Sequence, residues 1–458
     1  MKLLFGENVM KQKNGLLNDN IYQLLLKLSI PLIMGDVLQP LYNMIDAVII
    51  GIFVGNHAFA AVGIAGTVMN LFLFSVVGFS VGIVAILSQY YGERNYRKFR
   101  RESYLVLIPG SIAVVILSAL LIGMMQPILN LIQTPSVLIP YVKQYLTVIF
   151  CGMMISYLYN IFNGILQSVG NTKAVLKFLT VSIIGNVILD YIFVGIMGFG
   201  IRGAAIATCI AQAISAGSAF VCIRKQYSEL LFKKEDMQIE RSMIRRTLHF
   251  GLVSMMHQAS LYFGKILVQG AVNLLGVAAI SAYTATTRIE GFINSFSTSG
   301  SQAMSITIGQ NLGAGQKNRV KECLKKGMVL LGLLGLTLSA VLFIGAPTFL
   351  KLVNKNAGAE ELRAGVQYLK WVSVFYVFNY IGSAFVGYFR GVGKVEVAFK
   401  GTIIQMLFRI IISYACIRIM NLEAVAIATG IGWIAIVIYQ TWTYRKINGN
   451  SKFIKTAS

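Results

Sequence analysis

Two aspartates, Asp46 and Asp190, lie within apolar stretches of the chain that are long enough to cross a membrane. An ionisable side chain at membrane depth is costly unless it is paired or hydrated, so such residues usually mark functional sites. Both aspartates fall in the outer half of their stretches, at similar depth. Asn186 lies four residues before Asp190, and the two side chains therefore face the same way on a helix. Thr208, early in the following stretch, lies at a comparable depth.

These four polar side chains indicate a site for a coupling cation. Two neighbouring carboxyl groups can share a proton. Carboxylate, amide and hydroxyl oxygens are also ligands that suit a hard cation such as Na⁺. The sequence leaves H⁺ and Na⁺ open, and no metal other than Na⁺ at Asp46 and Asp190 is expected. In the structural alternative, each aspartate only caps or hydrogen-bonds a kinked helix.

The stretch that holds Asp46 also contains Pro31 and Pro40. Proline removes a backbone hydrogen bond and kinks or loosens a helix. A carboxylate on such a helix could therefore act as a switch, because protonation changes its hydrogen bonds. A static kink for packing is the alternative. Asp36 either lines an inner cavity or is solvated near the helix end.

The second half of the chain differs in its charges. Lys265 precedes Gly270 by five residues, as Asp46 precedes Gly51, so it is the rough counterpart of Asp46. Lys265 and Glu290 are candidates for a substrate cavity or a gate. Pairing of Glu290 with Lys265 or with Arg409 is favoured over that role. We expect the coupling cation to bind in the first half.

Composition identifies the elements that carry these residues. Of 458 residues, 56% are hydrophobic and 12% are charged, and the mean hydropathy is +0.70. A soluble protein cannot cover so much apolar surface, because its charged residues form the outside. The net charge of +23 lies in short basic tracts between apolar stretches, which argues against a nucleic-acid partner. The five cysteines show no CxxC spacing, and no GxxxxGK[ST] motif or catalytic set is present, so we expect neither ATP hydrolysis nor an enzyme.

Charges and turn residues divide the chain into twelve apolar stretches, each of which must be helical in lipid. This predicts an all-α polytopic membrane protein with spans at 27–51, 59–88, 103–126, 137–166, 174–197, 203–223, 247–271, 277–308, 327–350, 366–389, 398–419 and 424–444.

The loops predict the orientation. One side of the membrane carries 30 of the 40 Lys and Arg residues, and the opposite side carries 7. Positive loops stay in the cytoplasm. Both termini are therefore predicted to be cytoplasmic, in a multi-pass protein of the cytoplasmic (inner) membrane.

An internal repeat divides the spans into two sets of six. Ser88-Gln89-Tyr90-Tyr91-Gly92 matches Gly309-Gln310-Asn311-Leu312-Gly313 at an offset of 221 residues, and Gln167-Ser168-Val169-Gly170 matches Arg390-Gly391-Val392-Gly393 at 223. Six spans per repeat give both halves the same orientation, as in two-lobed transporters with a central cavity. The predicted division is an N-terminal lobe at 1–223, a cytoplasmic linker at 224–246 and a C-terminal lobe at 247–458.

The chain resembles the multidrug and toxic compound extrusion (MATE) family. The segments that carry the resemblance are Pro31-Leu32-Ile33, Gln39-Pro40-Leu41-Tyr42-Asn43-Met44-Ile45-Asp46, the run from Asn163 to Lys173, Asn186-x-x-x-Asp190, Gly309 to Gly315, and Phe389-Arg390-Gly391-Val392-Gly393. They follow one another at matching spacing along essentially the whole chain. Because the span that holds Lys265 contains no acid, the chain looks more like the DinF-like branch, in which carboxylates of the N-terminal lobe carry the coupling.

The resemblance implies a twelve-helix secondary antiporter that expels amphipathic, often cationic compounds in exchange for H⁺ or Na⁺. It adds Asn163 and Tyr145 to the cation site, places Gln39 nearby, and implies a kink at Pro31. Small organic substrates and membrane lipids are the expected partners, without an obligatory protein partner or a cofactor. The alternative is a flippase for lipid-linked saccharides or other amphiphiles, which a cavity rich in Lys and Arg would favour.

Overall fold

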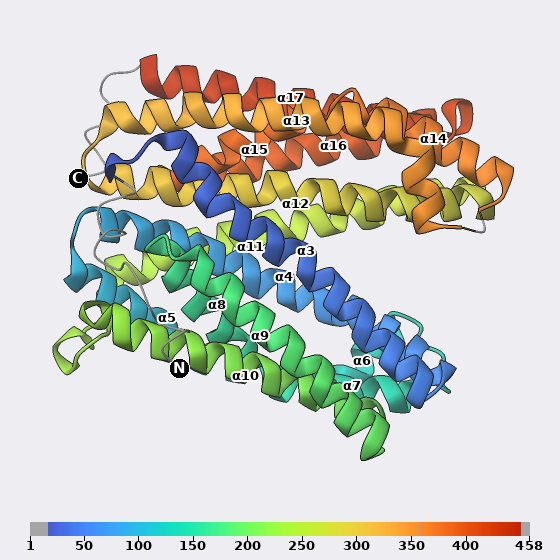
Figure 1. Cartoon of the computed structure of the whole chain (residues 1–458), viewed down its shortest axis with the longest axis horizontal. Helices are drawn as coiled ribbons and strands as arrows, with labels where there is room; N and C mark the ends of the chain where they lie inside the picture. The colour runs from blue at the N-terminus through green and yellow to red at the C-terminus, as the bar shows by residue number, and fades with distance from the viewer. Residues whose placement is uncertain (1–16, 356, 450–458) are drawn as a thin grey trace. The chain divides into compact units, whose positions relative to one another are not determined.

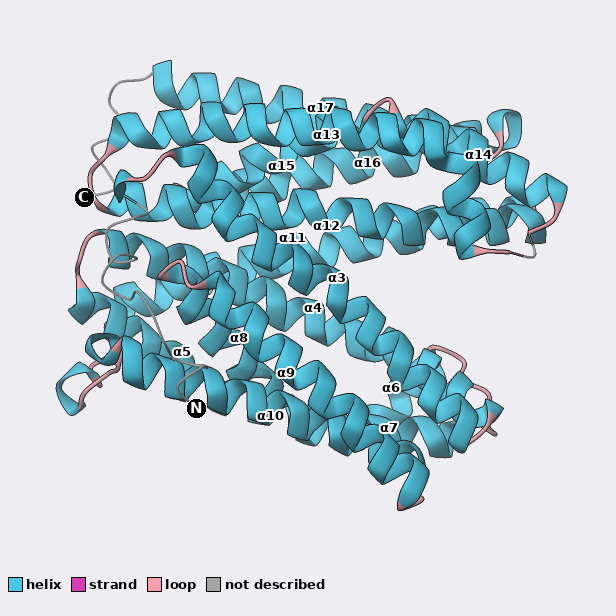
Figure 2. Cartoon of the chain, in the orientation of Figure 1, coloured by secondary structure: helices cyan, strands magenta, loops and turns pink. Residues whose placement is uncertain are grey.

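The structure, a computed structural model, describes residues 17–355 and 357–449, apart from the side chains of residues 71, 74, 448 and 449. Within this part of the chain every regular element is a helix and none is a strand (Figure 2). A helix satisfies all its backbone polar groups within one segment, which is what hydrocarbon surroundings demand. The predicted all-helical fold is confirmed.

The twelve predicted spans correspond to twelve helical segments of the described chain (Figure 1). These are α3 (Ile21–Phe53), α4 (Asn56–Gly92), α5 (Tyr96–Gly123), α7 (Ile139–Cys151) with α8 (Met153–Ser168), α9 (Thr172–Asp190) with the π-helix η1 (Tyr191–Ile196), α10 (Gly200–Gln226), α11 (Arg241–Val272), α12 (Val277–Gly313), α13 (Lys317–Val353), α14 (Ala359–Ser373) with α15 (Tyr376–Gly391), α16 (Val395–Met420) and α17 (Leu422–Gly449). The shorter helices are α6 (Met125–Leu131) and the 3₁₀ turns η2 (Ser228–Leu230), η3 (Lys234–Asp236) and η4 (Asn273–Leu275).

Eight of these helices are long and apolar enough to cross a membrane by themselves, and ten spans result if each bent pair counts as one. The other two, α11 and α12, have 32 and 37 residues and ample length, but they are less apolar. Lys265, Arg288 and Glu290 lie on them, together with many Ser and Thr residues. Their lower hydropathy therefore reflects polar groups placed at membrane depth.

Two spans that the sequence predicts as single stretches are broken. The axes of α7 and α8 differ by 47°, with the break at Gly152, and those of α14 and α15 differ by 52°. Neither break contains a proline. The two bent pairs occupy corresponding places in the two halves of the chain.

The repeat is visible in helix ends as well as in sequence. Helices α4 and α12 both have 37 residues and begin 221 residues apart. The matched glycines Gly170 and Gly393 follow α8 and α15, with φ angles of 86° and 82°. Only glycine adopts this left-handed conformation without steric cost, and it ends helices for that reason. The sequence motifs of the repeat therefore mark equivalent helix ends.

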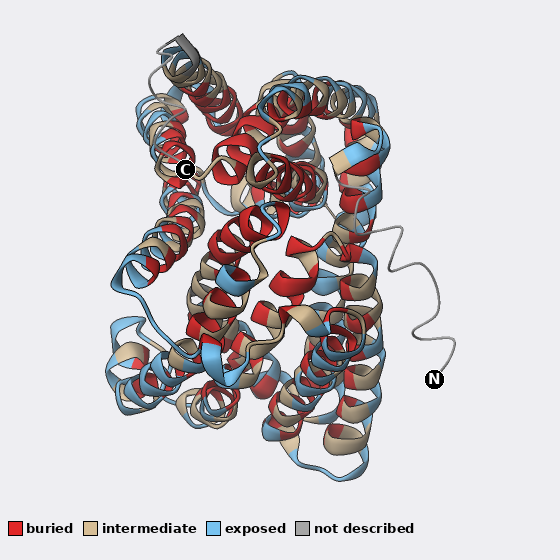
Figure 3. Ribbon diagram, turned by 90° about the vertical axis from the view of Figure 1, so that its left-hand side faces the viewer, coloured by how far each residue is buried: buried red, intermediate tan, exposed pale blue. Residues whose placement is uncertain are grey.

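The chain forms two compact units. Unit 1 contains Ile30–Met255, and unit 2 contains Asp19–Ser29 together with the chain from Met256 onward. Helices α3 and α11 thus each contribute one part to each unit, and residues 224–246 belong to unit 1. Figure 3 colours each residue of the ribbon by its burial, and buried and exposed residues alternate along the helices. Many large apolar residues are exposed, as expected for helices that face lipid.

Polar contacts hold the segment before α11, and the start of α11 itself, against the basic first turns of α5. Arg100 of α5 pairs with Asp236 at 2.5 Å, and Thr247 donates a hydrogen bond to Glu102 at 2.6 Å. Burial alone would raise the pKa of Asp236, but hydrogen bonds from Arg100 and from the Lys233 backbone bring that pKa below its ordinary value.

Candidate cation-coupling site

Helices α3, α9 and α10 of unit 1 bring together the four polar residues that the sequence singled out. Asp46 comes from α3, Asn186 and Asp190 from α9, and Thr208 from α10. All four are buried, with 7%, 1%, 0% and 9% of their surface exposed. Because buried polar groups are costly without partners, the arrangement of their hydrogen bonds decides what this cluster can do.

The side-chain amide of Asn186 joins the two carboxyl groups. In the orientation that satisfies both ends of the amide, its nitrogen donates to Asp46 Oδ1 at 2.8 Å and to Asp190 Oδ2 at 3.2 Å, and its oxygen accepts from the Thr208 backbone N–H at 3.2 Å. The two carboxylate oxygens are therefore at most about 6 Å apart, close enough for each charge to disfavour the other. The helical i, i+4 spacing of Asn186 and Asp190 makes this bridge possible.

Two tyrosines complete the cluster. Tyr42 of α3 donates a hydrogen bond to Thr208 Oγ1 at 3.2 Å. Tyr145 of α7 is buried, and both aspartates act electrostatically on its phenol group. The resemblance implied Tyr145, whereas no role was assigned to Tyr42. Its position four residues before Asp46 on the same helix is the signal that could have identified it.

Asp190 lies where the backbone changes its helical form. It is the last residue of α9, and the π-helix η1 follows directly. Single π-helical turns inside helices occur frequently at functional sites. The Oδ1 atom of Asp190 is buried and has no hydrogen-bond partner among the described residues. One carboxylate oxygen of the pair is thus free to receive a proton or to contact a cation.

The other predicted site residues take part in none of the hydrogen bonds just described. Asn163 of α8 is buried, but its Oδ1 has no partner in the part of the chain that the structure describes. Asp36 and Gln39 are exposed on α3. Pro31 lies inside α3, which continues as one helix from Ile21 to Phe53.

Unit 2 contains a different polar cluster, formed by α11, α12, α14 and α16. Buried Glu290 accepts a hydrogen bond from Tyr368 at 3.3 Å, and buried Arg409 donates one to Tyr283 at 3.3 Å. The rings of Tyr283 and Tyr368 meet edge to face, with centroids 5.7 Å apart. These contacts place Glu290 and Arg409 in one tyrosine-lined environment.

The predicted ion pair of Glu290 is not present among the described residues of this cluster. Within residues 17–355 and 357–449, no ion pair joins Glu290 to Arg409 or to Lys265, although both cations act electrostatically on it. The Nε atom of Arg409 has no hydrogen-bond partner in the same range, and Lys265 is exposed on α11. Two cations thus face one anion, which leaves the cluster with a positive excess.

Comparison with known proteins identifies the family. The sequence pattern of the MatE family matches residues 31–192 and 254–415, that is, once in each half of the chain at an offset of 223 residues. The chain belongs to the MatE family. Its resemblance to multidrug and toxic compound extrusion proteins is therefore confirmed, and it is a multi-pass membrane transporter rather than an enzyme.

Relatives and solved structures extend over nearly the whole MatE chain. The probable multidrug resistance protein YpnP of Bacillus subtilis is 26% identical over 407 residues, which are 87% of each chain. A FAD transporter of Shewanella oneidensis is 24% identical over 374 residues, which are 80% of each chain. A crystal structure described as MATE in the bent conformation superimposes with a TM-score of 0.91 at 21% identity, over 98% of this chain and 100% of the other. At this identity, the structural likeness establishes the fold.

Proposed function

We propose that this MatE protein is a secondary active antiporter that expels amphipathic, often cationic organic compounds in exchange for H⁺. The observation that carries the proposal is the single amide of Asn186, which bridges two buried carboxyl groups from different helices. Its relative in Bacillus subtilis, named as a probable multidrug resistance protein, supports the substrate class. We place the protein in the cytoplasmic membrane with both termini in the cytoplasm, because the predicted spans put 30 of its 40 basic residues on the side of the termini and positive loops stay in the cytoplasm.

The hydrogen bonds favour a proton over Na⁺ as the coupling ion. A sodium ion needs several oxygen ligands, but Asn186 presents its N–H groups to the carboxyls and uses its oxygen on the Thr208 backbone. A proton needs only one acceptor, and Asp190 Oδ1 has no partner among the described residues. Two carboxyl groups this close resist double ionisation, so one proton shared between them relieves the repulsion.

Proton binding would act on the helices that carry the carboxyls. Asp46 lies on α3, which contains Pro31 and Pro40, and Asp190 lies at the junction of α9 with a π-helix. Both backbones have weakened or altered hydrogen bonding, so a change in the carboxyl hydrogen bonds can change helix shape at low cost. Alternating access then requires that proton and substrate each bind one conformation better than the other.

The test uses purified protein in proteoliposomes with a fluorescent organic cation. A pH gradient and a Na⁺ gradient are imposed separately, on wild type, Asp46→Asn and Asp190→Asn. We expect the pH gradient alone to drive dye movement, and each substitution to abolish it. Glu93→Gln, an exposed acid at the end of α4, is the matched control and should transport normally. Movement driven only by Na⁺, or full transport by both aspartate variants, would refute the proposed coupling.

A second candidate function is the translocation of an anionic amphiphile, as in a flippase. The observation that favours it is the positive excess that Lys265 and Arg409 form around the buried acid Glu290. One relative of this chain, from Shewanella oneidensis, is named a FAD transporter, so at least one similar protein is named for a substrate other than a drug. Gradient-independent movement of a fluorescent phosphate-bearing lipid, lost in Lys265→Gln, would establish this function. If this lipid movement is absent and a pH gradient drives dye movement, the flippase function is excluded in favour of drug antiport.

A further inference from the structure

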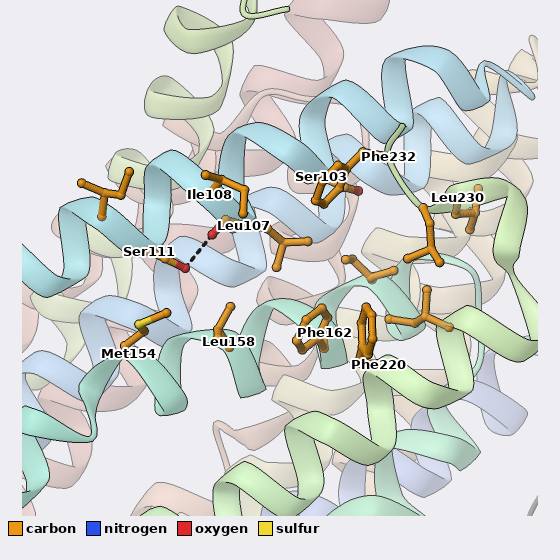
Figure 4. A pocket seen from close by; sticks show the side chains of 14 residues that line it. Ser103, Leu107, Ile108, Ser111, Met154, Leu158, Phe162, Phe220, Leu230 and Phe232 are labelled. Atoms are coloured by element: carbon orange, nitrogen blue, oxygen red, sulfur yellow. Dashed lines mark hydrogen bonds between the residues drawn. The ribbon is translucent and has the colours of Figure 1, made fainter. Parts of the chain in front are cut away.

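Unit 1 contains an apolar cavity that is separate from the cation-coupling site. It has a volume of about 340 Å³ and lies between α5, α8, α10 and the segment Leu230–Phe232. Figure 4 shows side chains from these elements pointing toward one another, among them Ile108, Leu158, Phe162 and Phe220. Ile108 and Phe220 are 44% and 38% exposed, so the cavity opens on a surface that faces hydrocarbon in a membrane.

One polar group lines this apolar space without a partner. Ser103 of α5 is only 2% exposed, and its Oγ has no hydrogen-bond partner among residues 17–355 and 357–449. Ser111, which also lines the cavity, donates to the Leu107 carbonyl at 2.5 Å (Figure 4). A buried hydroxyl without a partner is costly. Ser103 is therefore available to a polar group that enters from outside.

The depth of Ser103 matches the ester groups of a lipid. Ser103 directly follows the charged residues Arg100, Arg101 and Glu102 of α5, and the rest of the helix, as far as Gly123, is uncharged. The polar zone of each leaflet is about 5–8 Å thick, and the hydrocarbon begins beyond it. We therefore expect Ser103 near the boundary, with the apolar lining residues Leu107 and Ile108 on its hydrocarbon side.

Three basic residues directly follow lining residues of the cavity in the sequence. Arg224 directly follows the lining residue Ile223, and Lys233 and Lys234 directly follow Phe232. All three cations are exposed, and none forms an ion pair with another described residue. Arg100, by contrast, pairs with Asp236 and donates to the Glu229 carbonyl at 3.4 Å, which holds the segment after α10 against α5. The chain positions of these exposed cations, next to lining residues, favour an anionic ligand over a neutral one.

We propose that this cavity binds an anionic phospholipid from the leaflet on the basic side of the membrane. One acyl chain lies among the apolar side chains of α5, α8 and α10, an ester oxygen accepts a hydrogen bond from Ser103, and the phosphate lies near Arg224, Lys233 and Lys234. The argument for a lipid rests on charge complementarity, since an apolar cavity with a cationic mouth has the two-part chemistry of such a molecule. The site does not depend on the proposed antiport.

The test is photo-crosslinking of the full-length protein in nanodiscs. Two probes carry the same photoactivatable acyl chain, one on phosphatidylglycerol and one on phosphatidylcholine, and labelled peptides are mapped by mass spectrometry. We expect phosphatidylglycerol to label the stretch from Leu158 to Phe162 at least fivefold more than phosphatidylcholine. Leu158→Trp should fill the cavity and abolish this label.

Charge variants separate a specific site from ordinary lipid contact. The triple variant Arg224→Gln, Lys233→Gln, Lys234→Gln should lower labelling by phosphatidylglycerol to the level of phosphatidylcholine. The double variant Lys317→Gln, Lys321→Gln, two exposed lysines at the start of α13, should leave the preference unchanged. If the triple variant fails to fold, Ser103→Ala in the same assay should weaken the label. Equal labelling by both lipids in wild type, or displacement of the label by the transported dye, would overturn the proposal.

Discussion

Replacement of Asn186 by alanine tests the bridge between the two carboxyl groups. The substitution removes the donor that lies 2.8 Å from Asp46 and 3.2 Å from Asp190. If the pair shares one proton, one of the two hydrogen bonds has a charged acceptor and the other a neutral one. Hydrogen bonds to charged groups contribute about 1.5–3 kcal/mol, and neutral ones between membrane helices about 0.6 kcal/mol. Asn186→Ala should therefore lower the free energy of unfolding by about 2–4 kcal/mol.

The matched control is Ser182→Ala, one turn earlier on the same helix. Ser182 is buried and donates to the Ala211 carbonyl on α10 at 2.8 Å, so its loss removes a neutral interhelical hydrogen bond. We expect a cost of about 0.6 kcal/mol and unchanged transport. Unfolding in mixed detergent micelles measures the loss of stability in each variant. Dye movement driven by a pH gradient measures coupling, and Asn186→Ala should reduce this movement at least tenfold.

The reasoning would be refuted by a specific pattern. If Asn186→Ala is no less stable than Ser182→Ala and couples normally, the amide does not join the carboxyls. If Asn186→Ala loses stability but transports at the wild-type rate, the bridge is structural and the coupling site lies elsewhere. The predicted outcome is that Asn186→Ala loses both stability and coupling, while Ser182→Ala transports normally.

Three further outcomes follow from contacts in unit 1. The pKa of Asp236 is lowered, so its pairing with Arg100 should stabilise the protein fully above the ordinary pKa of 3.8 and cease to do so as the pH falls through the lowered pKa. The unfolding temperatures of wild type and Asp236→Asn should therefore differ at pH 6, and the difference should vanish as the pH falls through that lowered pKa. Tyr42→Phe removes the hydrogen bond to Thr208 and should cost about 1 kcal/mol, and an unchanged unfolding curve would contradict that contact. Gly82→Ala places a methyl group against the backbone of α11 and should lower the unfolding temperature by several degrees, whereas a rise would show that the helices can separate there.

The twelve helices could be predicted from the sequence because long apolar runs allow few alternatives in a membrane. The two bends could not. At the bend between α7 and α8, Gly152 is the only residue of a type that favours a break. At the other bend, no proline or glycine lies between α14 and α15. Bends of this kind follow from packing between neighbouring helices, which no local pattern encodes. The same holds for the π-helix after Asp190.

The candidate site was predictable where local periodicity governs it. The spacing of Asn186 and Asp190 put both side chains on one face, and the structure places them there with Asp46. The role of the amide depends on which of its atoms faces the carboxyls, and that is set by the Thr208 backbone on another helix. The favoured ion pair of Glu290 failed for a related reason, because tyrosine hydroxyls from other helices take the hydrogen bonds instead.

Proton release on substrate binding tests the central claim most directly. The purified protein, in weakly buffered detergent with a pH indicator, is mixed with the organic cation, and released protons are counted against bound substrate. If the Asp46–Asp190 pair holds the coupling proton, wild type should release about one proton per substrate bound, and Asp190→Asn should release none while still binding. Release that is unchanged in both Asp46→Asn and Asp190→Asn, or no release from wild type, would contradict the account.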